Sequence, residues 1–370
     1  MRELIEILKE MQLLEAASAA YAMATVVEVS GSTYRRTGAR MLLSPKGKTI
    51  GTVSAGCLEK DIVERAAQVI GSGKSQLVKY DATSDDDLFW GTGTGCGGAV
   101  YALVDCHATI PVCFAQLAGH LDQDEPAVLA TVYRHESERN NMTGQRVLFA
   151  KDQTVFDLCD NRELSAAIRT DAREVWSAGK NINKTYTLED GRADVLIEFI
   201  PPPQSLIIFG GEYDVRTLLE QAKRLGWRTT IVEHRQAFAN KERFPEANRV
   251  LLWHENSPPA ELTLNAHTAC VIMTHNYLVD KRFLIELLNS PVPYIGLIGP
   301  KKRGMQLLED ICKEQAQISE KQVSRLFGPV GLDLGADNPD EIALSIIAEI
   351  QAVMRGRTGG FLRDRKSSIH

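Results

Sequence analysis

Apolar and polar positions change their pattern at three consecutive prolines, residues 201–203. Beyond them, short apolar runs alternate with stretches in which apolar residues recur at helical spacing. The runs are 206–209, 229–233, 249–253, 269–273 and 294–298, and the helical stretches are 212–225, 279–289 and 301–316. This alternation is typical of βαβ units built on a parallel sheet. We therefore predict a Rossmann-like, doubly wound α/β domain over residues 204–370.

One more helix is predicted near the end of this domain. Asn338 suits an N-cap, Pro339 suits the first helical position, and two acidic residues follow in the first turn. The segment IALSIIAEIQAVM then places apolar residues at helical spacing. These signals predict a helix that begins at Pro339.

The first 200 residues contain two stretches that match when residue 24 is aligned with residue 130, an offset of 106. ATV at 24–26 meets ATV at 130–132, and TGAR at 37–40 meets TGQR at 143–146. The same offset aligns one expected helix with a second expected helix. We interpret this as an internal duplication. It predicts an N-terminal α+β domain over residues 1–200, with copies at about 1–105 and 107–200.

The two copies differ at the places where chemistry is expected. The first has SAGCLE at 54–59 and DDDLFWGTGTGCGG at 85–98. The second has DLCDNREL at 157–164 and only the polar stretch GKNINKT at 179–185. We therefore expect the first copy to carry the site and the second to serve as scaffold.

Composition excludes several classes of protein. The formal net charge of -6 gives no general attraction to nucleic acid. No apolar run approaches the ~18 residues of a membrane helix, and the charged N-terminal segment is unlike a signal peptide. We expect a cytoplasmic protein that binds neither nucleic acid nor membrane. The seven cysteines are odd in number and form no CxxC pair, which argues against a disulfide framework or structural zinc.

The glycine-rich segment 91–98 surrounds Cys96 with flexible backbone. Gly93, Gly95 and Gly97 allow the chain to approach a ligand closely, and successive N–H groups can form an anion nest that favours a thiolate. A flexible turn with an uninvolved cysteine fits the same composition. The segment is thus a candidate site whose chemistry the composition leaves open.

The turn containing Gly56, Cys57 and Glu59 follows an apolar strand and opens a helix. Free N–H groups at a helix N-terminus attract anions and lower the pKa of a nearby thiol. Glu59 alternatively satisfies the helix dipole itself, and Cys57 alternatively packs where strand and helix meet. Both interpretations stay open.

Three arginines, Arg35, Arg36 and Arg40, lie among glycines in the segment GSTYRRTGAR. Arginine suits bidentate recognition of phosphate. The alternative is a solvated basic hairpin. If the segment converges with the two cysteine turns, the three together suit a phosphorylated, sulfur-bearing ligand.

The turn after the first strand of the C-terminal domain departs from the dinucleotide fingerprint G-x-G-x-x-G/A. Gly210 matches the first glycine, but Glu212 stands at the second position, where a carboxylate repels pyrophosphate. NAD(P) binding is therefore doubtful. Further along, His275 and Lys301 follow two later strands, where ligands of open α/β sheets bind. His275 suits a proton carrier or a structural hydrogen bond.

Several segments together resemble one known family. GSTYRRTGARMLL, GTVSAGCLEKDI and WGTGTGCGG resemble the N-terminal motifs of the XdhC/CoxI family, and LIIFGGEYDV, VIMTHNYLVDKRFL and YIGLIGPKKR resemble its C-terminal Rossmann-like domain. The resemblance spans nearly the whole chain. One departure is the Gly210-Gly211-Glu212 turn, where related sequences usually show a GAG-like turn.

The resemblance implies an accessory protein for a molybdenum hydroxylase of the xanthine dehydrogenase type. Such a protein binds molybdenum cofactor (molybdopterin) as cargo, assists its sulfuration and inserts it into the apoenzyme. It implies a cysteine-desulfurase-type sulfur donor as a second partner, a homodimer, and Cys57 and Cys96 as possible molybdenum contacts. Two other functions stay open: a NAD(P)-dependent oxidoreductase using His275, and a structural component of a xanthine dehydrogenase complex.

Overall fold

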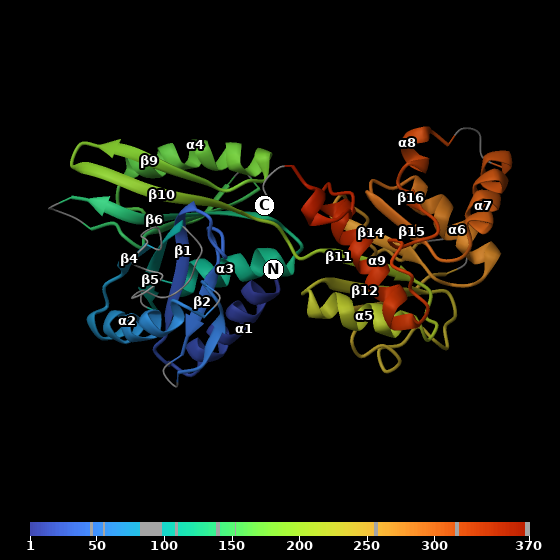
Figure 1. Ribbon diagram of the computed structural model, residues 1–370, viewed down its shortest axis with the longest axis horizontal. Coiled ribbons are helices and arrows are strands. Elements are labelled where there is room, and N and C mark those ends of the chain that lie inside the picture. Colours follow the sequence, from blue (N-terminus) through green and yellow to red (C-terminus); the bar gives the residue numbers. More distant parts are fainter. Residues whose placement is uncertain are drawn as a thin grey trace. The chain divides into compact units, whose positions relative to one another are not determined.

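The computed structural model describes residues 1–44, 47–54, 56–81, 98–107, 110–137, 141–151, 153–254, 258–314 and 318–366. The chain divides into two compact units, Met1–Pro202 and Pro203–His370. Figure 1 labels the elements of both.

The first unit contains two five-stranded antiparallel sheets and four helices among its described residues. The elements are α1 (Arg2–Ala16), β1 (Ala22–Gly31), β2 (Arg40–Leu43), β3 (Thr49–Gly51), α2 (Glu59–Ser72), β4 (Gln76–Asp81), β5 (Gly98–Cys106), α3 (Pro111–Asp122), β6 (Ala127–Glu136), β7 (Arg146–Ala150), β8 (Gln153–Asp157), α4 (Arg162–Ala178), β9 (Ile182–Leu188) and β10 (Gly191–Ile200). The strand orders are β3-β2-β1-β5-β4 and β8-β7-β6-β10-β9. The two halves, here called the first and second repeats, therefore share one topology.

The repeats also agree in register. In the first sheet, pairing between β1 and β5 shifts between Val26 and Glu28, and pairing between β6 and β10 shifts at the equivalent place. The residues skipped by these bulges are Val27 and Tyr133. Both are buried in one cluster with Leu103 of β5 and Leu196 of β10. Matching irregularities thus supply side chains that join the two sheets.

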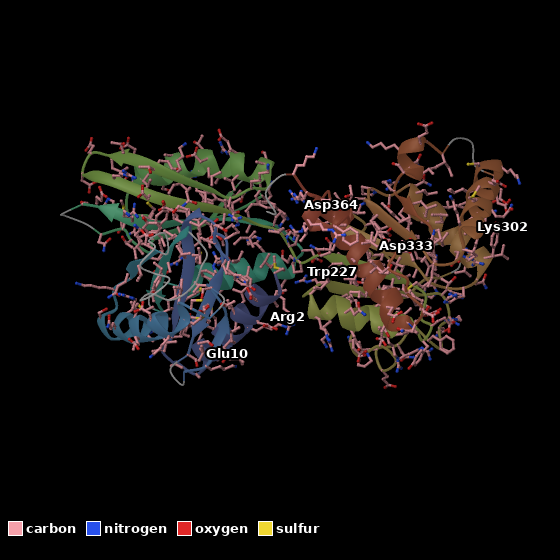
Figure 2. The ribbon with its side chains drawn as sticks, in the orientation of Figure 1. Arg2, Glu10, Trp227, Lys302, Asp333 and Asp364 are labelled. Atoms are coloured by element: carbon pink, nitrogen blue, oxygen red, sulfur yellow. The ribbon has the colours of Figure 1, made fainter. Side chains whose placement is uncertain are left out.

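Helices cover both sheets in an ordered way. The outer face of the first sheet packs on α2, and the outer face of the second packs on α4 (Figure 1). Helices α1 and α3 share a further core with the inner faces of both sheets. The polar face of α1 carries charged side chains, including Arg2 and Glu10 (Figure 2). Arg2 pairs with Glu6, and Glu10 pairs with Lys48, each at 2.7 Å. The apolar stripe of α1 thus faces inward, as its spacing requires.

Two buried ion pairs cross between the sheets in a reciprocal exchange. Arg40 on β2 pairs with Glu198 on β10 at 2.5 Å, and Arg146 on β7 pairs with Asp105 on β5. The ring of Phe114 on α3 lies 5.6 Å from one guanidinium and 5.7 Å from the other. Each repeat therefore supplies an arginine to a carboxylate of its twin, and the aromatic ring stacks against both cations.

Glycines make room for these pairs. Gly38 and Gly144 have φ angles of +89° and +92°, and each carbonyl accepts a hydrogen bond from the arginine two residues later. A Cβ on Gly38 would lie 2.3 Å from Oε1 of Glu198, and one on Gly144 would lie 2.6 Å from Oγ of Ser75. The repeated Thr-Gly-x-Arg motif therefore serves the packing of one repeat on the other.

The second unit is a six-stranded parallel sheet of order β13-β12-β11-β14-β15-β16. Its elements are β11 (Ser205–Phe209), α5 (Val215–Arg224), β12 (Arg228–Glu233), β13 (Arg249–Leu252), β14 (Thr268–Ile272), α6 (Tyr277–Leu288), β15 (Tyr294–Leu297), α7 (Lys301–Glu314), α8 (Glu320–Val323), β16 (Leu326–Phe327), α9 (Pro339–Met354) and the 3-10 helix η2 (Leu362–Asp364). This order is that of the doubly wound Rossmann sheet, which confirms the predicted fold class.

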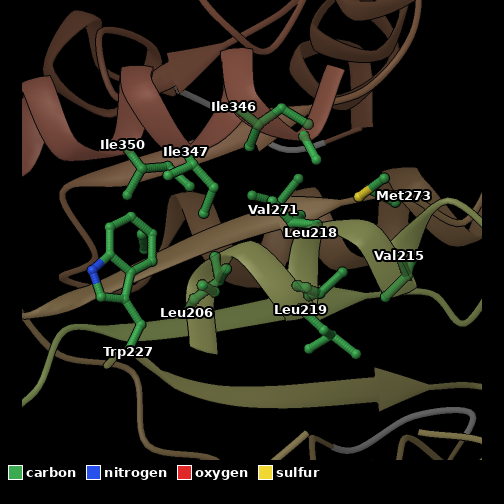
Figure 3. Packing of buried hydrophobic residues seen from close by; sticks show 14 of the residues in the cluster. Leu206, Val215, Leu218, Leu219, Trp227, Val271, Met273, Ile346, Ile347 and Ile350 are labelled. Atoms are coloured by element: carbon green, nitrogen blue, oxygen red, sulfur yellow. The ribbon is translucent and has the colours of Figure 1, made fainter. Parts of the chain in front are cut away.

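Two hydrophobic cores hold this sheet. Helices α5 and α9 cover one face, where Leu218, Leu219 and Ile346 pack near Val271 (Figure 3). Helices α6 and α7 cover the other face. The start of α9 agrees with the sequence, because the side chain of Asn338 accepts a hydrogen bond from the N–H of Glu341 at 3.1 Å. Among the described residues, none of the helices has the length and apolar character needed to cross a membrane.

Candidate functional site

Three connecting segments of the first repeat leave one edge of its sheet. Strand β1 runs antiparallel to β2 and β5, β3 antiparallel to β2, and β4 antiparallel to β5. The C-terminal ends of β1, β3 and β4 therefore lie along the same edge of the sheet as the N-terminal ends of β2 and β5. The segments at that edge are residues 32–39, 52–58 and 82–97. They hold or border every candidate site residue of the first repeat.

The third of these segments lies outside the described residues. The structure consequently places neither Cys96 nor its neighbours Gly93, Gly95 and Gly97. The residue that follows the segment, Gly98, is described. A Cβ there would lie 2.4 Å from the carbonyl oxygen of Ser32, so the end of the glycine segment is anchored beside the arginine-bearing segment.

The length of segment 82–97 distinguishes the two repeats. Its counterpart between β9 and β10 is residues 189–190 alone. The sequence pattern placed that counterpart at 179–185, and this is wrong, because β9 begins at Ile182 and takes up most of that stretch. The first repeat therefore carries an inserted segment, with four glycines and Cys96, where its twin has a tight turn.

The turn before α2 is stabilised by its own side chains. Oγ of Ser54 accepts hydrogen bonds from the N–H groups of Gly56, Cys57 and Leu58 at 3.1–3.2 Å. Cys57 is a free, exposed cysteine in this turn. Its thiol is accessible, but the N–H groups around it are already engaged by Ser54.

Glu59 closes the same turn. Its carboxylate accepts hydrogen bonds from the N–H groups of Ser54 and Leu58 at 2.9 and 3.1 Å, and from the hydroxyls of Thr52 and Ser54. Burial by itself would raise the pKa of Glu59, but these hydrogen bonds outweigh it and lower the pKa to about 2. The negative charge at the start of α2 is thus supplied by the protein itself.

Replacing Glu59 by glutamine should alter how stability depends on pH. A carboxyl whose folded pKa is lowered from 4.5 to about 2 stabilises the native state above its unfolded pKa, and that contribution disappears as pH falls from about 4.5 to about 2. We expect Glu59→Gln to be less stable than the wild type near neutral pH and to lose less stability on acidification. Urea unfolding at a series of pH values measures both.

The matched control is Glu64→Gln, which removes an exposed carboxylate from the same helix. Its pH profile should follow that of the wild type. Identical profiles for Glu59→Gln and Glu64→Gln would contradict the assigned role of Glu59.

The three candidate arginines have different environments. Arg35 pairs with Glu3 of α1, its Nη1 lying 3.2 Å from Oε1. The side chain of Arg36 is exposed, and no hydrogen bond or ion pair to its guanidinium is found among the described residues. Arg40 is only 6% exposed and is held by Glu198. The three side chains line one cavity of about 390 Å³, and Cys57 is not among the described residues of its wall.

The first turn of the Rossmann unit is filled by protein charges. Gly210 has φ +119°, and a Cβ there would lie 2.6 Å from the carbonyl oxygen of Met273, so the turn packs directly on the end of β14. Arg235 binds Glu212 at 2.6 Å and buried Glu233 at 2.8 Å. Both carboxylates already have a cationic partner. This arrangement does not favour a pyrophosphate beside Glu212. That NAD(P) does not bind tightly here stays a prediction.

The two other candidates of this unit follow β14 and β15. His275 has a left-handed φ of +56°, and its Nε2 lies 3.2 Å from Oδ2 of Asp214. Lys301 is exposed at the start of α7, while Arg303, two residues further on, pairs with buried Asp280 at 2.6 Å. The structure thus orients the imidazole of His275 with a carboxylate, an arrangement that suits proton transfer or a structural hydrogen bond.

Two segments of the chain match family models. Residues 14–81 match the model described as the XdhC and CoxI family, and residues 206–350 match the model described as the XdhC Rossmann domain. Together these matches cover more than half of the chain. This protein belongs to the XdhC and CoxI family.

Several known proteins are similar to this chain over both units. A Bacillus subtilis protein named as a probable xanthine dehydrogenase subunit is 28% identical over 328 residues, 89% of this chain and 91% of its own. An Escherichia coli protein named molybdenum cofactor insertion chaperone PaoD is 20% identical over 90% of this chain and 82% of its own. A crystal structure described as a xanthine dehydrogenase from Bacillus halodurans, 25% identical, has a TM-score of 0.73 and covers 95% of this chain and 96% of that one.

The six described cysteines of this XdhC-family protein differ in exposure, and Cys159 is intermediate. Cys106, Cys113 and Cys270 are buried, and burial raises the pKa of Cys113 to about 12. Cys57 and Cys312 are exposed. In the described part of the chain no three His, Cys, Asp or Glu side chains gather to hold a metal ion. Direct thiolate contact to molybdenum by Cys57 and Cys96 therefore stays a prediction.

Sequence analysis missed three residues that shape these XdhC sites. Tyr34 lines the arginine cavity, Ser54 closes the Cys57 turn, and Asp214 orients His275. A hydroxyl residue three positions before Cys57, at the start of a helix, is a detectable signal of a local side-chain cap. The roles of Tyr34 and Asp214 depend on residues far away in the sequence and have no such local signal.

Proposed function

We propose that this protein binds molybdenum cofactor as cargo and delivers it to the apoenzyme of a molybdenum hydroxylase of the xanthine dehydrogenase type. One observation carries the proposal: the segments bearing Cys57, Cys96 and the arginines all leave one edge of one sheet, and the segment with Cys96 is absent from the equivalent edge of the second repeat. Family membership and the name of the relative from Escherichia coli support the same function.

The residue types at this edge fit the chemistry of the cargo. Molybdopterin carries a phosphate and a dithiolene, and the two dithiolene sulfurs hold the molybdenum in the complete cofactor. Arginine recognises the phosphate, while a thiolate of Cys57 or Cys96 would add a further sulfur ligand to a metal that the dithiolene already binds through sulfur. Because Ser54 and Glu59 satisfy the start of α2, that helix adds little anion binding. A site made of a few accessible contacts suits a carrier that must release its cargo.

The proposal includes two protein partners. The apoenzyme receives the cargo, and a cysteine-desulfurase-type enzyme supplies sulfur while the cofactor is held at the exposed edge. An accessible edge is suited to both, because neither partner needs the carrier to unfold. A homodimer stays part of the proposal, without a described surface assigned to it.

The thiol contacts can be tested by removing Cys57 and Cys96 together. We expect the Cys57→Ala/Cys96→Ala protein, expressed in a host that makes the cofactor, to be purified with much less molybdenum and pterin than the wild type. Metal analysis by mass spectrometry and fluorescence of oxidised pterin measure the two contents. The matched control is Cys312→Ala, which removes an exposed cysteine from the second unit and should leave both contents unchanged. If the double variant carries as much of both as the wild type, the thiol contacts are wrong.

A further inference from the structure

A cavity of about 390 Å³ opens in the first unit between the start of α1, the segment 34–40 and the end of β10. Its volume falls within the ~300–1,000 Å³ typical of small-molecule sites. Among its walls are Tyr34, Arg35, Arg36, Arg40, Asn181 and Glu198. The cavity is therefore large enough for a small ligand and is lined by several charged groups.

The charges around the cavity leave an uncompensated cation. Glu3 is paired with Arg35, and Glu198 with Arg40. The guanidinium of Arg36 has no ion pair or hydrogen bond with any residue that the structure describes. The cavity wall thus contains three arginines and two carboxylates, and the remaining charge is positive.

Arg40 is held mainly by the protein itself, with one donor left over. Its side chain is 6% exposed, and two of its guanidinium nitrogens are engaged by Glu198 and the carbonyl of Gly38. Its Nε–H is buried and, within the described residues, has no hydrogen-bond partner. A buried donor without an acceptor is costly. The second repeat has the same feature, because Nε of Arg146 is also buried and without a partner among the described residues. The cation that distinguishes the cavity is therefore Arg36.

The second repeat provides an internal comparison. The framework residues Gly38 and Arg40 recur there as Gly144 and Arg146, with the same hydrogen bond between them. Arg36, by contrast, corresponds to Met142, which is 2% exposed and packs in the hydrophobic core. The free cation is therefore not required by the fold of the repeat, since the twin repeat folds with an apolar residue in its place.

Tyr34 completes the site. Its side chain is 66% exposed although it borders the cavity. An exposed aromatic ring beside an arginine provides a stacking surface for a planar heterocycle next to an anion-binding group. From this combination we infer that the cavity binds a phosphate monoester carried by a planar heterocycle, with Arg36 on the phosphate and Tyr34 on the ring.

Two kinds of molecule carry a phosphate monoester on a planar heterocycle. One is the pterin phosphate of the proposed cargo, and in that case the inference rests on the proposed function. The other is a free purine mononucleotide. Guanosine monophosphate serves as a probe for both, because guanine and a pterin share the fused aminopyrimidinone ring. Inorganic phosphate is the probe that lacks the ring.

The test is calorimetric titration of the full chain with guanosine monophosphate and with inorganic phosphate. We expect the wild type to bind the nucleotide more tightly than phosphate. Arg36→Met, which copies the second repeat, should weaken nucleotide binding by about tenfold or more. Tyr34→Ser should weaken nucleotide binding by about tenfold and leave phosphate binding unchanged. The control Arg169→Met removes an exposed arginine from α4 and should bind as the wild type does.

Analysis of the molecule bound after purification from a cofactor-producing host distinguishes the sources. Loss of bound pterin in Arg36→Met assigns the cavity to the cargo. If the wild type is purified without pterin, but the titration shows the expected losses, the cavity binds a nucleotide. In that case the inference about the cavity holds and the proposed function is wrong. If Arg36→Met and Arg169→Met bind guanosine monophosphate equally, or the wild type does not bind it, the inference is wrong.

Discussion

Replacing Arg146 by methionine is expected to lower the free energy of unfolding of the first unit by about 3–5 kcal/mol. Arg146 is 1% exposed and Asp105 is fully buried, so the substitution leaves a carboxylate in the interior without its cation. The same change removes the hydrogen bond to the carbonyl of Gly144. Hydrogen exchange of the amides in β5 and β7 at increasing urea concentration measures the effect in the first unit separately from the second.

Two further variants distinguish the effect of breaking the buried ion pair from the effect of losing any arginine charge. Arg65→Met breaks a pair with Asp61 whose side chains are 37% and 43% exposed, and it should change stability by less than about 1 kcal/mol. The double variant Asp105→Leu/Arg146→Met removes both buried charges and should recover a large part of the loss. Equal losses for Arg146→Met and Arg65→Met would show that the interior pair has no special role.

These ion pairs illustrate what sequence analysis could not supply. The offset of 106 residues aligns Arg40 with Arg146 correctly, because a repeated motif is a local pattern. It gives no indication that Glu198 and Asp105 are their partners, since each partner belongs to the other repeat. The sequence therefore suggests a surface phosphate contact for Arg40, whereas its guanidinium is mostly engaged in the interior.

The Rossmann unit was more predictable, because its signals are local. Each predicted strand overlaps an observed strand of the sheet, from β11 to β15, and the N-cap at Asn338 was located correctly. Buried parallel strands are continuous apolar runs, and helix caps depend on residues within one turn. Short elements without such signals, α8 and β16, were not predicted.

The sequence predicts which segments form the candidate site, but it does not predict the contacts that their side chains make. Glycine, cysteine and arginine content identified the three segments, and antiparallel pairing brings their ends to one edge. The engagement of Ser54 and Glu59 at the start of α2 depends on side-chain geometry that composition does not encode. Compositional signals therefore located the candidate site, whereas the available donors and acceptors required coordinates.

The largest functional effect is expected from replacing residues 83–97 by the dipeptide Glu-Asp, which joins β9 to β10 in the second repeat. The first repeat should still fold, because β4 and β5 pair in the same register as β9 and β10, and the twin closes with that short turn. The shortened protein should be purified with molybdenum and pterin at background level. Circular dichroism and hydrogen exchange in β4 and β5 report the fold, and metal and pterin analysis report the cargo.

The reciprocal control changes residues 189–190 to Gly-Gly, which alters the turn of the second repeat and leaves segment 82–97 intact. It should keep the full cargo content, because we assign cargo binding to the first repeat alone. A folded, shortened protein that retains wild-type molybdenum and pterin would place the cargo elsewhere. Loss of cargo in both variants would indicate instead that the paired sheets as a whole, rather than the inserted segment, determine binding.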